Sequence, residues 1–270
     1  MHLVRDRAAE FGIRGIDPER LWFDLPANVA RKDKIIQGII DGIYSWVNKD
    51  ENITFIRGRA EFTSPVDIRV DGQTIGAEKS IIATGSRTAD VHVPGLTEVG
   101  FITNNEALQL QELPSSLIIV GAGYVGVEFA QMYSRFGTHV TLLSRSPWIM
   151  RHEEPELSEW LGKLMMAEGI ELCLSATVVR AEMSGKEKAV VAEIEGQERR
   201  LKAEEILFAA GRVPRVDGLG LKQAGVELGP HVSRWMDLYT QRPATSGRWA
   251  TSTVGPCSPT RQLTMGQLPP

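Results

Sequence analysis

The sequence predicts an α/β fold with a parallel sheet, and residues 117–151 carry that prediction. Residues 117–120 are apolar and mostly branched, which is typical of a short buried parallel strand. Apolar residues at helical spacing follow up to Phe136, and residues 139–143 give a second strand. Between the first strand and the helix, three glycines have the spacing G-x-G-x-x-G: Gly121, Gly123 and Gly126. This order of strand, glycine turn, helix and strand indicates a Rossmann-type dinucleotide-binding unit.

Glycine-rich turns also serve plain packing, so the order of the elements matters more than the motif itself. In a dinucleotide site the first glycine allows a tight turn and the second lets the backbone approach a pyrophosphate. The third lets the helix pack closely on the strand. The N-terminus of the helix can then hold a phosphate.

The end of the second strand indicates which nucleotide is bound. An NAD site usually has an acidic residue there, which accepts hydrogen bonds from the ribose 2′-hydroxyl. This chain has Ser144 and Arg145 instead, with Arg151 six residues further on. Two guanidinium groups can bind a 2′-phosphate, and the less favoured alternative is that both arginines are solvated surface charges. We therefore expect NADP(H) rather than NAD(H).

Composition excludes several classes of protein. Hydrophobic residues make up 42% of the 270, and the net charge of −4 without a basic cluster argues against a nucleic-acid partner. No apolar run is long enough for a membrane span, and the charged N-terminus is not a secretory signal. Cys173 and Cys257 lie far apart in sequence, which favours a reducing, cytoplasmic location. Either could be a reactive thiol or a small buried side chain.

The residues before the glycine turn predict one long helix and a small antiparallel ribbon. Residues 1–12 resemble the end of a helix, and residues 29–47 form a helical pattern whose isoleucine stripe we expect to pack in a core. Alternating apolar and polar residues predict four strands, at 53–56, 60–62, 68–70 and 73–75. A buried strand is expected at 79–83, ending in a turn that contains Thr84 and Gly85.

The residues after it predict a second helix and a group of strands. A helix is expected from Pro155, with a buried face of Leu157, Leu161, Leu164 and Met165, and it should end at Gly169. Strands are expected at 170–174, 177–181, 189–194, 198–201 and 205–209. The last strand ends in a small-residue turn at Gly211, similar to the one at Gly85. Small residues at both turns let backbone pass close to a flat cofactor.

Several separated motifs now carry a resemblance to a known family. IIATGSR at 81–87, VPGL at 93–96, the glycine-turn segment at 113–143 and ILFAAGRVP at 206–214 appear in this order. They resemble the FAD-dependent pyridine nucleotide-disulfide oxidoreductases, and most of all the mercuric-reductase and dihydrolipoamide-dehydrogenase branches. The resemblance implies a Rossmann-type NAD(P)-binding domain inserted into a partial FAD-binding domain. In that family NADPH passes hydride to flavin, and electrons continue to a redox disulfide and the substrate.

The resemblance also implies domain boundaries and site residues. Residues 1–95 would form a partial FAD-binding domain, 96–214 the NAD(P)-binding domain, and 215–230 a return to the FAD domain. Glu128 would lie near the nicotinamide and flavin, and Gly211 would border the nicotinamide side. The residues expected to contact cofactors are Gly121, Gly123, Tyr124, Val125, Gly126, Glu128, Ser144, Arg145, Arg151, Gly211, Thr84 and Gly85.

The chain departs from the family pattern in three respects. It has no second glycine fingerprint for FAD, no C-x-x-x-x-C redox pair, and no C-terminal dimerisation domain, through which family members form homodimers. FAD binding is therefore doubtful, no catalytic or metal-binding residue is assigned, and we expect no disulfide reduction by this chain alone. Three interpretations remain open: an incomplete enzyme of the family, a non-catalytic NADP(H)-binding module, and a structural protein with an unused nucleotide fold.

Residues 231–270 lose all strand and helix periodicity and predict a disordered tail. Each residue restricts the codon that encodes it, so the sequence limits which residues the same gene could encode in a shifted reading frame. In that frame the codons of residues 235–237 can encode only Asp-Gly, and those of residues 246–255 can encode W-A-V-G-D-V-x-G. The family has a motif V-D-x-x-L-x-T followed by W-A-x-G-D, so we interpret this tail as read out of frame.

Overall fold

The computed structural model describes residues 7–15, 17, 20, 22–226 and 228. They divide into two compact units, which are described separately. The first combines the described residues up to Phe55 with Thr88–Gly211, and the second combines Ile56–Arg87 with the described residues from Arg212 onward. The tail at 231–270, for which the sequence predicts disorder and a shifted frame, lies outside the described residues.

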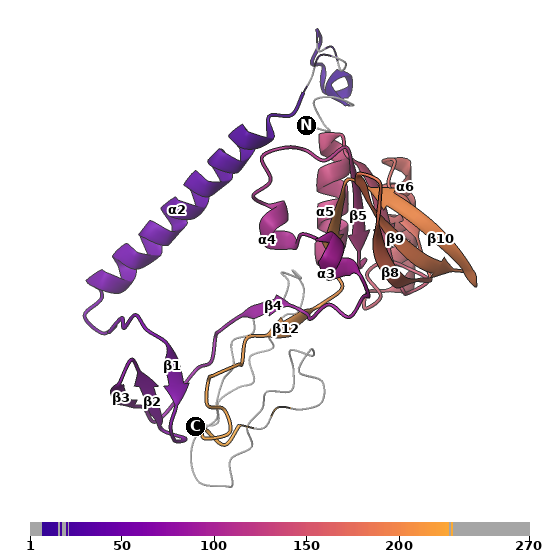
Figure 1. The fold of residues 1–270 in the computed structure, drawn as a ribbon. Helices are drawn as coiled ribbons and strands as arrows, with labels where there is room; N and C mark the ends of the chain where they lie inside the picture. Colours follow the sequence, from indigo (N-terminus) through magenta and orange to yellow (C-terminus); the bar gives the residue numbers. More distant parts are fainter. Residues whose placement is uncertain (1–6, 16, 18–19, 21, 227, 229–270) are drawn as a thin grey trace. The chain divides into compact units, whose positions relative to one another are not determined.

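A four-stranded parallel sheet forms the centre of the first unit (Figure 1). Its strands are β5 (Ser116–Val120), β6 (His139–Leu143), β7 (Glu171–Cys173) and β11 (Glu205–Phe208), in the order β11-β5-β6-β7. Leu117 and Ile119 contribute to one core cluster, and Ile118 and Val120 to the other. Successive residues of a strand point to opposite faces, so the sheet is buried on both sides, as parallel sheets usually are. The α/β fold with a parallel sheet that the sequence predicts is confirmed.

Two helices cover one face of this sheet. Helix α5 (Tyr124–Phe136) follows β5 and ends at Gly137 in the left-handed conformation, as expected. Helix α6 (Pro155–Ala167) has proline in its first turn and precedes β7. The core between these helices and the sheet includes Val127, Ala130, Tyr133, Met165 and Leu207.

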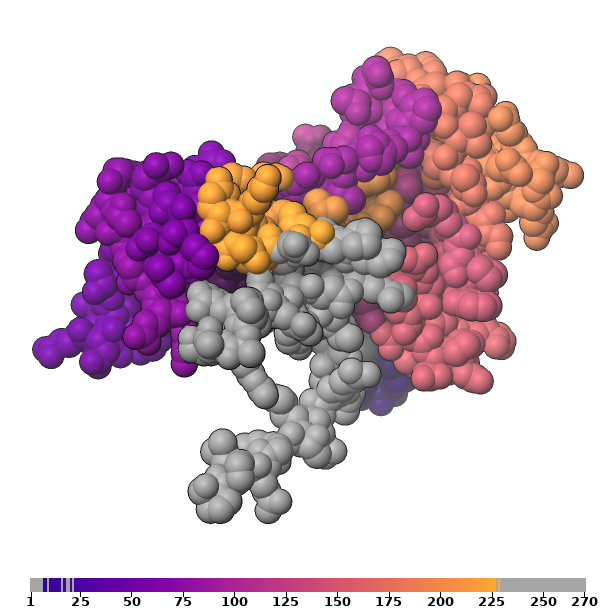
Figure 2. Space-filling model, turned by 90° about the horizontal axis from the view of Figure 1, so that it is seen from below, coloured from indigo at the N-terminus to yellow at the C-terminus, as the bar shows by residue number. Residues whose placement is uncertain are grey.

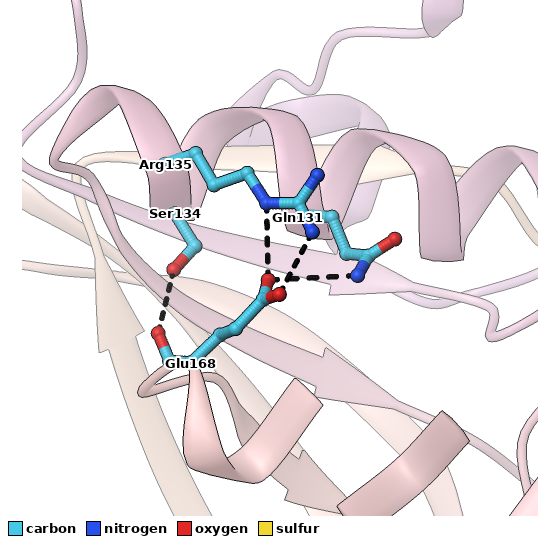
Figure 3. Close-up of polar contacts among 4 residues, drawn as sticks. All are labelled: Gln131, Ser134, Arg135 and Glu168. Carbon is cyan, nitrogen blue, oxygen red and sulfur yellow. Dashed lines mark hydrogen bonds and ion pairs between the residues drawn. The ribbon is translucent and has the colours of Figure 1, made fainter. Parts of the chain in front are cut away.

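The C-terminal ends of the two helices are joined by a polar cluster (Figure 3). Arg135 of α5 donates from Nε and Nη2 to the two carboxylate oxygens of Glu168, at 3.1 and 2.8 Å. Gln131 donates to the same carboxylate at 3.5 Å, and Ser134 donates to the Glu168 carbonyl at 3.2 Å. Only 12% of the Glu168 side chain is exposed. The cluster therefore fixes α5 against the end of α6.

A three-stranded antiparallel sheet covers the other face. Its strands are β8 (Ala176–Ser184), β9 (Glu187–Ile194) and β10 (Gln197–Ala203), in the order β10-β9-β8. Strand β10 is one of the two edge strands, and its first four residues are exposed at the surface (Figure 2), whereas Ala203 at its end is buried. Two short helices, α3 (Leu96–Val99) and α4 (Asn104–Ala107), lead into β5.

The second unit contains a small antiparallel ribbon. Its strands β1 (Ala60–Phe62), β2 (Asp67–Val70) and β3 (Gln73–Gly76) match three of the four strands expected there. Strand β12 (Arg212–Pro214) pairs with β4 (Ser86–Thr88). The strands expected at 53–56 and 79–83 are wrong. No described strand pairs with either segment, and Ile81 is 66% exposed, so neither has the hydrogen-bond partner or the burial that stabilises a strand.

Helix α2 (Leu25–Lys49) forms as expected, but its burial does not follow the expectation. The Asp24 side chain caps its first turn by accepting from the Ala27 N–H, and a proline follows at the start, so local signals suffice to begin the helix. Its buried residues are Leu25 and Val29. The isoleucines expected in a core are exposed: Ile35, Ile36, Ile39, Ile40 and Ile43. An apolar stripe indicates which face favours burial, but not whether a partner covers it.

The buried face of α6 agrees only in part with the expected one, since Met165 is buried and Leu161 packs against the core as expected. Leu157 and Leu164 are exposed, while Ser158, Gly162 and Met165 are buried. This face of α6 lies next to β7, because an added Cβ at Gly162 would stand 3.6 Å from Leu172, an ordinary contact distance. Along the described part of the chain, no helix is both long and apolar enough to cross a bilayer.

Candidate functional site

The glycine turn joins β5 to α5 and permits two close backbone approaches. Gly121 has φ +111°, and an added Cβ there would lie 2.6 Å from the carbonyl oxygen of Ala209 at the end of β11. An added Cβ at Gly126 would lie 1.8 Å from the carbonyl oxygen of Gly121. Side chains at these two positions would collide with backbone, so the helix can start this close to the sheet only with glycine.

The second glycine of the motif, Gly123, faces open space. Gly123 is the N-cap residue of α5, where no side chain accepts a hydrogen bond from the first turn. An added Cβ there would meet nothing within 4 Å. The first N–H groups of a helix lack intrahelical partners and attract anions, so this end of α5 can accept a phosphate. The turn therefore fits the pyrophosphate of a dinucleotide.

The segment after β6, residues 144–153, forms a loop beside this turn, which we call the arginine loop. It starts at Ser144, which is buried and whose hydroxyl donates to the Trp148 carbonyl at 3.2 Å and accepts from the Ser146 N–H. Further along, the Met150 N–H donates to the Ala122 carbonyl at 2.7 Å. The loop is therefore folded back onto the glycine turn, and the Ser144 hydroxyl forms its hydrogen bonds with the backbone of the loop itself.

Both arginines of the loop are exposed. Arg151 donates from Nε to Nε2 of His152 at 3.2 Å, which leaves its terminal nitrogens for another acceptor. Arg145 has no hydrogen bond or ion pair with any described residue. Two guanidinium groups at one loop give a local positive charge, which suits a phosphate.

Tyr124, the first residue of α5, reaches the far end of the loop. Its hydroxyl donates to Oε1 of Glu153, and this hydrogen bond together with burial raises the pKa of Tyr124. Glu153 was not among the residues that the sequence indicated. Its position, two residues before Pro155, marks only the start of a helix, and a contact between side chains 29 residues apart leaves no local pattern.

The remaining expected residues are divided between the two units. Val125 is half-buried against the core of the first unit, and Glu128 is exposed on α5. Gly211 also belongs to the first unit, and its carbonyl accepts from the Ala89 N–H at 3.0 Å. Thr84 and Gly85 belong to the second unit. There the Thr84 hydroxyl donates to the Arg215 carbonyl at 2.6 Å, and the Arg215 N–H donates to the Gly85 carbonyl at 3.0 Å.

Cys173 lies within the core rather than at this site. It is 3% exposed at the end of β7, and burial, with the nearby Glu171 carboxylate, raises the pKa of its thiol. A thiol held in its protonated form is a poor nucleophile. Among the described residues, no group of His, Cys, Asp and Glu side chains is arranged to hold a metal ion.

Comparisons with known proteins show the family of this chain. Residues 16–243 match the family described as pyridine nucleotide-disulphide oxidoreductase. Mercuric reductase from Staphylococcus aureus is 34% identical over 206 residues, which are 76% of this chain and 38% of that protein. Mitochondrial dihydrolipoyl dehydrogenase from Pisum sativum is 30% identical over 84% of this chain and 46% of its own length.

A solved structure is also similar to this chain. The HOCl-induced flavoprotein disulfide reductase RclA from Escherichia coli is 30% identical, with a TM-score of 0.69 over 77% of this chain and 47% of that one. The chain thus spans less than half the length of these relatives.

Proposed function

The chain belongs to the pyridine nucleotide-disulphide oxidoreductase family, and we propose that it binds NADP(H) at the glycine turn and the arginine loop. In this proposal it provides the nucleotide side of an FAD-dependent NAD(P)H oxidoreductase similar to mercuric reductase and dihydrolipoamide dehydrogenase. The observation that carries the proposal is the uncapped start of α5 at Gly123, with open space where a pyrophosphate would lie.

Each part of the site has a separate role in binding. The first N–H groups of α5 bind the pyrophosphate, and Gly126 allows the helix to start close enough to the sheet. Arg145 and Arg151 bind the 2′-phosphate. Glu128 and Gly211 border the nicotinamide end, as the resemblance to the family implies. When bound, NADPH supplies a hydride from its nicotinamide ring.

The conformation of Ser144 supports a preference for NADPH over NADH. NADH is recognised by an acidic side chain that accepts from the 2′-hydroxyl. At this position Ser144 is buried, and its hydroxyl already donates to Trp148 and accepts from Ser146. The loop therefore lacks the acceptor for a 2′-hydroxyl but offers two cations for a 2′-phosphate.

Calorimetric titration of the 270-residue chain with NADPH and NADH tests this proposal. We expect NADPH to bind about tenfold or more tightly, since two partly exposed arginine–phosphate contacts contribute roughly 1–3 kcal/mol. Arg145→Ala and Arg151→Ala should each weaken NADPH binding and leave NADH binding unchanged. Arg200→Ala, on the edge strand β10, is a matched control because it removes one exposed arginine elsewhere on the same unit. Equal affinities for both nucleotides in the unaltered chain would contradict the proposal.

The residues present do not fit FAD as they fit the nicotinamide nucleotide. The sequence has one G-x-G-x-x-G turn, and that turn is assigned to NADP(H), so we derive no step through a flavin. The burial and raised pKa of Cys173 favour a second candidate function, an NADP(H)-binding module without thiol redox chemistry. A yellow purified protein that oxidises NADPH with Hg(II), a quinone or a disulfide would support the enzyme. A colourless protein that binds NADPH without turnover would support the module.

A further inference from the structure

The arginine loop is attached to the glycine turn at two points near its C-terminal end. One is a backbone hydrogen bond, from the Met150 N–H to the Ala122 carbonyl at 2.7 Å. The other is a side-chain hydrogen bond, from the Tyr124 hydroxyl to the Glu153 carboxylate. Arg151 lies between these two attachments in the sequence, so both limit where its guanidinium can reach.

The side-chain attachment is the stronger candidate for controlling the loop. Met150 has φ +48°, a left-handed conformation that a non-glycine residue adopts only when its surroundings impose it. Glu153 is half-buried, whereas its neighbours Arg151, His152 and Glu154 are exposed. A hydrogen bond to a carboxylate is stronger than one between neutral groups. The Tyr124–Glu153 contact therefore supports a loop conformation that is unfavourable by itself.

We propose that Glu153 is a positioning residue for nucleotide selectivity, which holds the arginine loop against the glycine turn through Tyr124. This inference rests on the proposed function, since it concerns how the arginines meet the 2′-phosphate of NADPH. Glu153 does not contact the nucleotide in this account. It acts by keeping Arg151 close to the pyrophosphate turn.

Simple electrostatics gives the opposite expectation. Glu153 carries a negative charge two residues from Arg151, so its removal should strengthen the binding of a doubly charged phosphate. If the attachment matters more than the charge, its removal should weaken that binding. The direction of the effect therefore separates the two accounts.

The test uses the full 270-residue chain and two pairs of ligands, NADPH with NADH, and 2′,5′-ADP with 5′-ADP. Tyr124→Phe removes the hydrogen bond without changing charge, and Glu153→Ala removes both the bond and the charge. Glu154→Gln is the matched control, because Glu154 is the exposed N-cap residue of α6 and its side chain makes no capping hydrogen bond. Thermal unfolding followed by circular dichroism checks that every variant is folded.

We expect Tyr124→Phe to weaken the binding of 2′,5′-ADP and NADPH by about fivefold, the loss of one charge-assisted hydrogen bond that is partly exposed. Glu153→Ala should also weaken this binding but by less, because removing the negative charge acts in the opposite direction. The affinities for 5′-ADP and NADH should stay the same, and the double variant should lose no more than either single one. Glu154→Gln should keep or slightly raise the affinity for 2′,5′-ADP.

Three results would overturn the inference while leaving the proposed function intact. They are an unchanged affinity in Tyr124→Phe, a gain in Glu153→Ala like that of the control, and an equal loss for the ligands without a 2′-phosphate. Failure of the unaltered chain to bind NADPH would refute the proposed function itself, and this inference with it.

Discussion

Replacing Gly126 by alanine tests the close packing that the glycine motif permits, separately from the phosphate binding that we propose for it. The new Cβ would stand 1.8 Å from the Gly121 carbonyl oxygen, whereas Cβ contacts below 3.0 Å are essentially never found. The atom it meets belongs to backbone, which cannot rotate away. Helix α5 and the turn would therefore have to move apart by more than an ångström.

The size of the effect follows from two opposing contributions. Overpacking of a well-packed core costs about 1–3 kcal/mol, and a collision with backbone belongs at the upper end. Alanine favours a helix interior over glycine by about 1 kcal/mol. The net loss in the free energy of unfolding is then about 2 kcal/mol, which lowers the Tm by about 4–8 °C for a chain of this size.

Two other glycines are matched controls for Gly126→Ala. Gly162→Ala in α6 meets only an ordinary contact of 3.6 Å with Leu172, so it should raise stability slightly through helix propensity. Gly123→Ala meets nothing within 4 Å, so it should leave the Tm unchanged but weaken NADPH binding by placing a methyl group in the expected pyrophosphate position. Thermal unfolding and calorimetric titration measure both quantities. A Tm for Gly126→Ala equal to that of the unaltered chain would refute the packing argument.

Three further predictions concern the core of the first unit. Glu168→Gln removes the charge that Arg135 binds through two nitrogens, and it should lower the free energy of unfolding by about 1–2 kcal/mol in urea titration. Burial raises the pKa of Tyr133 to about 12, above its ordinary value of 10.0. Between pH 10 and 12 the unfolded chain loses the Tyr133 proton while the folded chain keeps it, so stability should fall as the pH rises through this range. Tyr133→Phe should reduce that fall in high-pH unfolding curves, while a slope unchanged by the substitution would argue against it. Because burial raises the pKa of the Cys173 thiol, iodoacetamide should label the Cys173 peptide much more slowly in the folded chain than in urea, as mass spectrometry can measure.

The parts of the fold that were predictable from sequence depend on local constraints. The glycine turn was predictable because three fixed positions must lack a side chain, and the structure gives a steric reason at two of them. The four parallel strands were predictable because each is a short apolar run, and a sheet buried on both faces needs such runs. The stop at Gly137 follows from the left-handed conformation that glycine adopts easily.

The errors have a common physical cause, since each concerns burial by a distant partner. Residues 79–83 have the composition of a buried strand, but a strand forms only where another strand offers its N–H and C=O groups. The isoleucines of α2 have the spacing of a core face, but the described residues leave that face exposed. On α6, the small residues Ser158 and Gly162 determine the packed face, although leucines are more apolar.

The arginine loop depends both on local sequence and on distant partners, and in our proposal it determines which nucleotide the site binds. The absence of an acidic residue directly after β6 and the presence of Arg145 and Arg151 can be read from the sequence. Its conformation depends on bonds to distant residues, from Ser144 to the Cys173 carbonyl, from Met150 to Ala122, and from Tyr124 to Glu153. A loop with the same charges but without these bonds would spread its guanidinium groups over many positions, and ordering them on binding would cost conformational entropy. In our proposal, nucleotide preference therefore depends on the anchored loop, and substitutions that never touch the phosphate should change it.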